Sequence, residues 1–154
     1  MLKINETAPV FEAKNSEGQF VNVGGISSKI TVIYFYPKDD TPSCTIQAND
    51  FSALKDSYEN QGAIVYGISK DNTESHSNFI NKFNLKIELL TDEKGDICES
   101  YNTWGEKEKN GVKKIGIIRS TFIIGKDGML KYVEYKVKAK DHAKGMLKLI
   151  SQFT

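Results

Sequence analysis

The order of apolar and polar positions in the first half of the chain predicts a β-α-β-α arrangement. Ile30–Tyr36 is a β-branched and aromatic run that stops at Pro37, as in a fully buried central strand. Apolar side chains then recur at helical spacing and predict a helix over roughly 45–60. A second buried strand is expected over 64–69, and a second helix is expected to begin near 71–74.

The second half predicts shorter elements. Residues 88–91 fit a short strand and 96–101 a short helix, and the charged stretch around 104–111 is expected to be a polar loop.

A hairpin and a terminal helix close the chain. Ser120–Ile124 and Met129–Val137 flank Gly125–Gly128, whose turn chemistry favours an antiparallel pair of strands. An amphipathic helix should follow Asp141, which suits an N-cap. Early parallel crossovers and a late hairpin together predict an α/β domain of three layers, with a central mixed β-sheet flanked by helices.

Composition narrows the class of protein without naming a function. The 154 residues, 39% hydrophobic and 27% charged with no internal repeat, predict one globular domain over 1–154. A net charge of +1 gives no basic excess for nucleic acid, and no apolar run is long enough to cross a membrane. Lys3 and Glu6 interrupt any signal-peptide core, so a cytoplasmic protein is expected.

The cysteines are the first candidates for a catalytic residue. Only Cys44 and Cys98 are present, too few for a disulfide scaffold or a structural zinc site. Cys44 begins the first predicted helix, where unpaired N–H groups and the helix dipole favour a thiolate, the nucleophilic form. Thr41 can offer a hydroxyl there, and Pro37 stiffens the approach. The alternative is that Cys44 is a small buried hydrophobic residue.

The residues around Cys44 resemble a known motif. Pro37-x-x-x-Thr41-x-x-Cys44, after an aromatic strand, is similar to the active-site motif of the peroxiredoxins, and Arg119 stands before a late strand where that family has an arginine. Further segments resemble the bacterioferritin-comigratory, or Q-type, branch: Ala8–Phe11, Phe35–Pro37, and Tyr101 with Trp104–Lys107.

The resemblance implies a thioredoxin-like fold and a thiol peroxidase that reduces hydrogen peroxide and organic hydroperoxides. It implies that Cys44 attacks the peroxide, that Pro37 and Thr41 line the pocket, and that Arg119 supplies the cation. No cofactor motif is visible, and no cofactor is expected. The implied reductant is thioredoxin, glutaredoxin or a low-molecular-weight thiol, and the implied assembly is a monomer or small homodimer.

Two positions depart from the Q-type pattern. Many members have a resolving cysteine where this chain has Asn49, and others have one in the next helix, yet 72–84 contain none. Cys98 is thus the only intramolecular candidate for resolving the oxidised thiol, although a buried structural thiol is the favoured interpretation. A one-cysteine cycle with an external thiol is therefore the working hypothesis, with a Cys98-resolved cycle as the alternative. Gln47 replaces a glutamate common among relatives.

Several other residues are not expected to take part in chemistry. His76 and His142 are expected to be partly exposed helix residues, and Asp39 and Asp40 to be solvated loop residues. Trp104 fits a packing anchor better than a docking surface for a reductant. Two rival functions remain: a dithiol oxidoreductase, for which no C-x-x-C pair exists, and a non-catalytic binding or chaperone-like module.

Overall fold

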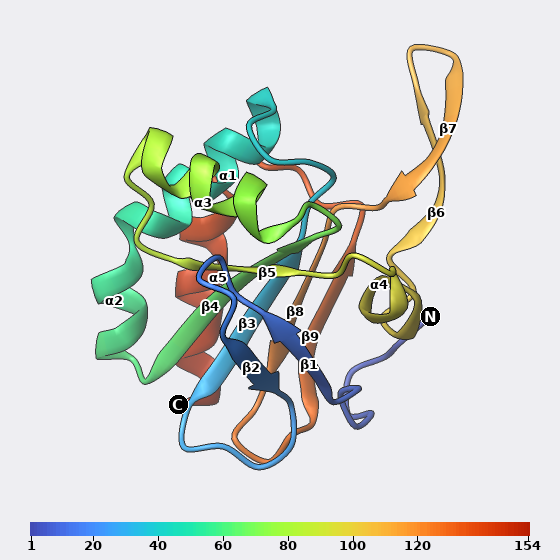
Figure 1. Ribbon diagram of the computed structural model, residues 1–154. Helices are drawn as coiled ribbons and strands as arrows, with labels where there is room; N and C mark the ends of the chain where they lie inside the picture. Colours follow the sequence, from blue (N-terminus) through green and yellow to red (C-terminus); the bar gives the residue numbers. More distant parts are fainter.

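A computed structural model describes residues 1–154, and its central feature is a seven-stranded mixed sheet covered by helices (Figure 1). The strand order is β2-β1-β5-β4-β3-β8-β9, and β6 and β7 form a separate two-stranded sheet. The strands are β1 (Phe11–Lys14), β2 (Phe20–Val23), β3 (Ile30–Phe35), β4 (Ala63–Ser69), β5 (Glu88–Thr91), β6 (Trp104–Lys109), β7 (Val112–Ile117), β8 (Ser120–Ile124) and β9 (Leu130–Tyr135). The helices are α1 (Pro42–Ala53), α2 (Lys55–Asn60), α3 (Thr73–Phe83), α4 (Asp96–Ser100), α5 (His142–Ile150) and the 3₁₀ turn η1 (Ser151–Phe153).

Strand β3 lies between its neighbours with every residue buried, as its uninterrupted apolar sequence predicts. It pairs in parallel with β4 and antiparallel with β8, with Phe35 opposite Ser120 in the second pair. The carboxyl end of β3 therefore meets the amino end of β8. Residues just beyond these two ends are brought together although they are far apart in sequence.

The sheet separates two hydrophobic cores. Alternate side chains of β3, such as Val32 and Tyr34, point into a core shared with α1, α2, α3 and α5. The intervening Ile33 and Phe35 point into a second core, which includes residues of α4 and of the N-terminal segment. This division confirms the central sheet flanked by helices that the sequence predicts.

Most predicted elements are present, but the expected single helix over 45–60 is wrong. The segment forms α1 and α2, and the helix is interrupted at Leu54, whose φ of −99° and ψ of 8° are not helical. Helix α1 also begins earlier than expected, at Pro42, because proline at the first helical position loses no hydrogen bond and has a suitable φ.

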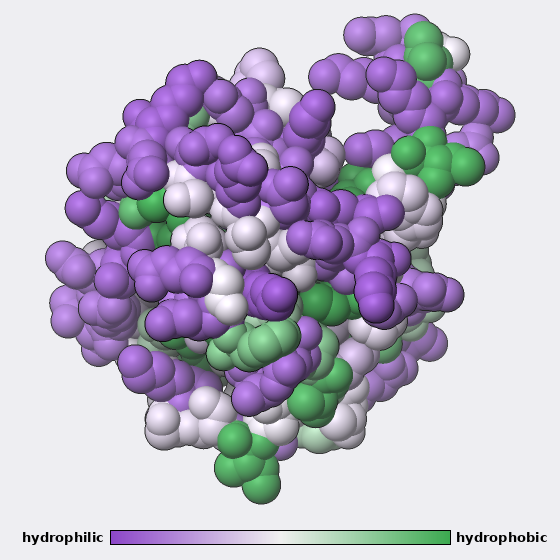
Figure 2. All heavy atoms as spheres, in the orientation of Figure 1, coloured by the Kyte–Doolittle hydropathy of each residue, from purple (hydrophilic) through white to green (hydrophobic).

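The polar loop expected around 104–111 is also wrong. Residues 104–117 form the β6–β7 hairpin, which projects from the body of the molecule (Figure 1). Its turn is Asn110-Gly111, with φ of 54° and 78°, the left-handed pair that a tight hairpin turn needs. Figure 2 shows this projection to be largely hydrophilic with isolated apolar side chains, of which Ile115 is 72% exposed.

The ends of the chain differ from the sequence expectation in smaller ways. The short strands β1 and β2, at one end of the sheet, were not expected, and β9 is shorter than the predicted 129–137. Asp141 precedes α5 as expected, but its side chain makes no capping hydrogen bond. No helix of the structure has both the length and the apolar character to span a bilayer.

Candidate active site

Cys44 lies where β3 leads into α1. It is the third residue of the helix and is only 1% exposed. Its side chain contributes to the core on the α1 side of the sheet. The thiol is thus held at the end of a buried strand and within the first turn of a helix, the position that the sequence predicts.

Arg119 reaches Cys44 through the pairing of β8 with β3. It immediately precedes Ser120, which pairs with Phe35 at the carboxyl end of β3. One guanidinium nitrogen donates to Cys44 Sγ at 3.4 Å, and the other donates to Gln47 Oε1 at 2.6 Å. Gln47 lies one turn after Cys44 on the buried side of α1. The fork of the guanidinium therefore joins the thiol and the amide, a geometry that lysine would not reproduce.

The first turn of α1 offers further hydrogen-bond donors. The N–H groups of Ser43 and Cys44 have no acceptor, since helix α1 has no side-chain cap. Thr41 occupies the N-cap position, but its hydroxyl donates to the carbonyl of Lys38 at 2.8 Å and not to the sulfur. Pro37 and Thr41 are both half-buried on the same loop. Free amides and a guanidinium around one sulfur favour an anion there.

The comparisons with known proteins agree with this geometry. The model of the AhpC/TSA family matches residues 4–133. The chain belongs to the peroxiredoxins of the AhpC/TSA family.

Relatives of this peroxiredoxin cover almost its full length. It is 44% identical to the bcp protein of Helicobacter pylori strain J99 over 95% of this chain and 96% of that protein. It is 37% identical to peroxiredoxin Bcp of Bacillus subtilis strain 168 over 99% and 98%. The structure of a mutant of Xanthomonas campestris peroxiredoxin Q matches with a TM-score of 0.87 and 33% identity, covering 94% of this chain and 92% of that one. These matches place the fold among the thioredoxin-like peroxiredoxins of the Bcp, or Q, branch.

Cys98 lies on the other side of the peroxiredoxin's sheet. It belongs to the second core and is fully buried in α4. Burial, followed by the hydrogen bond and the negative charge of Asp92, raises the pKa of the Cys98 thiol to about 12. Asp92 also accepts the N–H groups of Ile97 and Cys98, at 3.1 and 2.8 Å. The structure thus places Cys98 apart from Cys44, Arg119, Thr41 and Pro37.

Two nearby side chains were missed by the sequence reasoning. The Tyr34 hydroxyl is buried without a partner, and burial is the main reason that its pKa lies above the ordinary range, with Cys44 a further cause. Lys107 of β6 donates to the carbonyl of Ile117 at 2.8 Å. Desolvation first, and then the charge of Arg119, lowers the pKa of this lysine. Lys107 could not be found from the sequence, because its position depends on the β6–β7 hairpin, which was not predicted.

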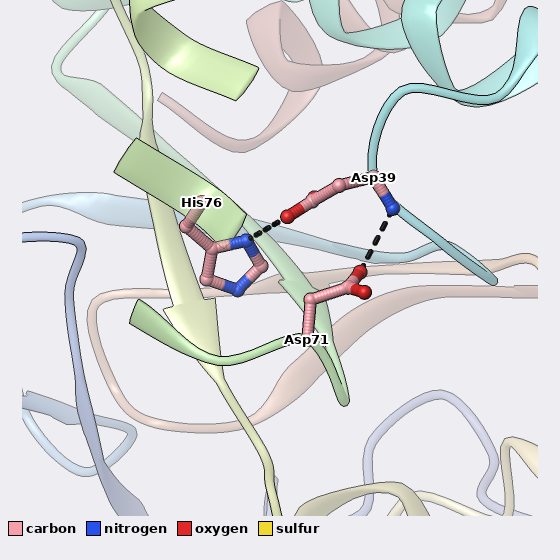
Figure 3. A group of neighbouring side chains, drawn as sticks. All are labelled: Asp39, Asp71 and His76. Carbon is pink, nitrogen blue, oxygen red and sulfur yellow. Dashed lines mark hydrogen bonds and ion pairs between the residues drawn. The ribbon is translucent and has the colours of Figure 1, made fainter. Parts of the chain in front are cut away.

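The expectation that Asp39 is solvated and His76 partly exposed is wrong. Asp39 is 7% exposed and His76 is fully buried, and they face one another at 2.7 Å with Asp71 beside them (Figure 3). A buried carboxylate requires such partners. His142 is buried too, with Thr121 Oγ1 at 2.7 Å from its Nε2. Asp40 is exposed, as expected.

Trp104, expected to be a packing anchor, is half-exposed at the start of β6. The ammonium of Lys70 lies 4.4 Å from the centre of its ring. The indole is therefore covered on one face by a lysine and is not enclosed in the core.

Proposed function

We propose that this peroxiredoxin reduces hydrogen peroxide and organic hydroperoxides with the thiolate of Cys44. The observation that carries the proposal is the Arg119 guanidinium at 3.4 Å from Cys44 Sγ, next to first-turn amides that have no acceptor. A sulfur anion and the oxygen anion that forms beside it both need such donors.

The first step forms one bond and breaks another. The Cys44 thiolate attacks one peroxide oxygen, the S–O bond forms as the O–O bond breaks, and the departing alkoxide or hydroxide takes a proton from water. Cysteine becomes sulfenic acid, and the peroxide becomes an alcohol or water. No metal or organic cofactor takes part in this step.

Each neighbour of Cys44 has a role in the proposal. Arg119 stabilises the sulfur anion and then the charge that develops on the leaving oxygen, because its guanidinium is always charged and has several donors. The free N–H groups of Ser43 and Cys44, together with Thr41, hold the peroxide oxygens, while Pro37 keeps the loop stiff.

We further propose a one-cysteine cycle. An external thiolate attacks the sulfenic sulfur, the S–S bond forms as the S–O bond breaks, and the departing hydroxide takes a proton to become water. A second thiol then reduces the mixed disulfide. Cys98 is not the resolver in this cycle. Its position in the other core, its full burial and its raised pKa support that assignment. Thioredoxin, glutaredoxin or a low-molecular-weight thiol would serve as the reductant.

The same proposal covers the domain organisation, the assembly and the location of the chain. The chain would act as one peroxiredoxin domain over residues 1–154, as a monomer or small homodimer, in the cytoplasm. A peroxide and a thiol would then be its only reaction partners.

One equivalent of hydrogen peroxide followed by mass spectrometry tests the proposal. The expected product is a sulfenic acid on Cys44, trapped by dimedone, with Cys98 unmodified. A stoichiometric Cys44–Cys98 disulfide would instead establish the two-cysteine cycle. Absence of any peroxide-dependent change at Cys44 would reject the peroxidase and favour the non-catalytic module, and disulfide reduction without peroxidase activity would favour a dithiol-type oxidoreductase.

A further inference from the structure

The loop that carries Cys44 into α1 is attached to α3 by a buried polar network (Figure 3). The Asp39 carboxylate accepts three hydrogen bonds: from the Tyr36 hydroxyl at 2.6 Å, from His76 Nδ1 at 2.7 Å and from the Ser75 hydroxyl at 2.8 Å. The backbone N–H of Asp39 donates to Asp71 Oδ2 at 2.8 Å. Asp39 is therefore bound through both its side chain and its main chain.

Both ring nitrogens of His76 have a buried partner in this arrangement. Its Nδ1 faces the Asp39 carboxylate, and its Nε2 faces the Leu90 carbonyl at 3.1 Å. The Leu90 carbonyl can only accept, so His76 Nε2 donates to it. The contact between His76 and Asp39 is almost entirely removed from water, so losing either side chain would leave a buried polar group of the other without its partner.

The same contacts argue against a metal ion in the cluster. Asp39, Asp71 and His76 have ligand atoms within 4.8 Å of one another, a composition that suits a metal. However, both nitrogens of His76 are already engaged by protein partners, Nδ1 by Asp39 and Nε2 by the Leu90 carbonyl. The network is complete without an ion.

Residues 37–41 have few other attachments to the rest of the molecule. Apart from bonds within the loop and to α1, they are held by Asp39 and by one ion pair between Asp40 and Lys82 of α3, at 2.7 Å. The Asp40–Lys82 pair is exposed, with both side chains more than two-fifths accessible, and so contributes little. The buried network therefore carries most of the attachment of this loop.

We propose that Asp39 and His76 are positioning residues that set the balance between the two halves of the reaction cycle. This inference rests on the proposed peroxidase function. Reaction with peroxide uses the closed loop, in which Arg119 and the first-turn amides surround the sulfur. Reduction by an external thiol requires that the sulfur, buried here to 1% exposure, become reachable. Release of Asp39 from His76 opens the loop and exposes the oxidised Cys44.

The test compares two rate constants in His76→Gln, Asp39→Asn and the double variant. Oxidation of Cys44 by hydrogen peroxide and reduction of its sulfenic acid by dithiothreitol are each measured in a single turnover. In either single variant the ratio of reduction to oxidation is expected to rise about tenfold, because the open population grows. The double variant is expected to fall short of the product of the two single effects, since its two amides can pair again.

Lys82→Ala is the matched control, because it removes the exposed pair between the same loop and the same helix. The ratio of reduction to oxidation in Lys82→Ala should equal that of the wild type. Hydrogen exchange gives a readout that does not depend on activity: the amide of Thr45, which donates to the carbonyl of Thr41, should exchange faster in His76→Gln and at the wild-type rate in Lys82→Ala. If His76→Gln does not fold, Ser75→Ala, which removes one donor to Asp39, should raise the ratio about twofold.

An unchanged ratio in the folded network variants, or strictly multiplicative effects in the double variant, would overturn the proposal. An equal increase in Lys82→Ala would overturn it as well. These results differ from failure of the peroxidase function itself, in which wild-type Cys44 would not react with hydrogen peroxide at all.

Discussion

The two cysteines of this peroxiredoxin are equally buried, at 1% and 0% exposure, yet their surroundings are opposite. Cys44 lies in the first turn of α1 with a guanidinium at 3.4 Å. Cys98 lies on the other side of the sheet with a carboxylate beside it, and the pKa of its thiol is raised to about 12. Burial, which raises the pKa of the Cys98 thiol, therefore does not by itself decide the reactivity of a thiol, and the charges and donors next to the sulfur also matter.

The largest difference is expected when each sulfur is removed in turn. Cys44→Ser should abolish peroxide consumption, because the other thiol, Cys98, is fully buried beside the Asp92 carboxylate, whereas Cys98→Ser should keep the rate constant of the first turnover. Stopped-flow peroxide consumption measures both. Equal losses in the two variants would show that the cysteines act together.

Removal of the cation should bring the Cys44 environment closer to that of Cys98. Arg119→Ala is expected to slow oxidation of Cys44 by about 10²- to 10³-fold, the usual loss for a donor to a developing oxyanion. Stopped-flow mixing with hydrogen peroxide measures this rate constant. Arg119→Lys is the control that keeps the charge without the fork, and it should recover only part of the rate.

Removal of the Asp92 carboxylate should make the Cys98 thiol more reactive. In Asp92→Asn the pKa of Cys98 should fall from about 12, because a charge that favours the protonated thiol is lost, but burial should keep it above the ordinary value. Alkylation of Cys98 by iodoacetamide at a fixed alkaline pH should become about tenfold faster. Glu99→Gln, an exposed carboxylate on the same helix, serves as the control and should have no effect.

The smallest effect is expected at Gln47. Gln47→Glu replaces a buried amide whose Nε2 has no partner by a carboxylate that can still accept from Arg119. Tighter positioning of the guanidinium and partial neutralisation of its charge oppose each other, so the oxidation rate should change by no more than about threefold. A loss as large as that of Arg119→Ala would contradict the assignment of Gln47 to a supporting role.

Local sequence patterns were enough to predict the central sheet. Ile30–Phe35 had to be buried on both faces, and the Gly125–Gly128 turn required a hairpin. The β6–β7 hairpin was missed because its strands are charged and show no apolar alternation. Asn110-Gly111, between two segments of equal length, was the signal that could have revealed it.

In the candidate site, too, some features could be predicted from the sequence and others could not. The contact of Cys44 with Arg119 was expected because a family motif resembles both regions, whereas no local pattern links positions so far apart. The burial of Asp39 and His76 was not predictable, since each looks like a surface residue until the fold supplies the other as partner. Buried polar pairs between loops and helices depend on tertiary contacts that periodicity does not encode.

The antiparallel pairing of β8 with β3 has a consequence during synthesis. Cys44 leaves the ribosome well before residue 119 has been translated, and until β8 joins the sheet its sulfur has no guanidinium beside it. A growing chain therefore presents a thiol of ordinary reactivity, and its sensitivity to oxidants begins only when the last strands are in place.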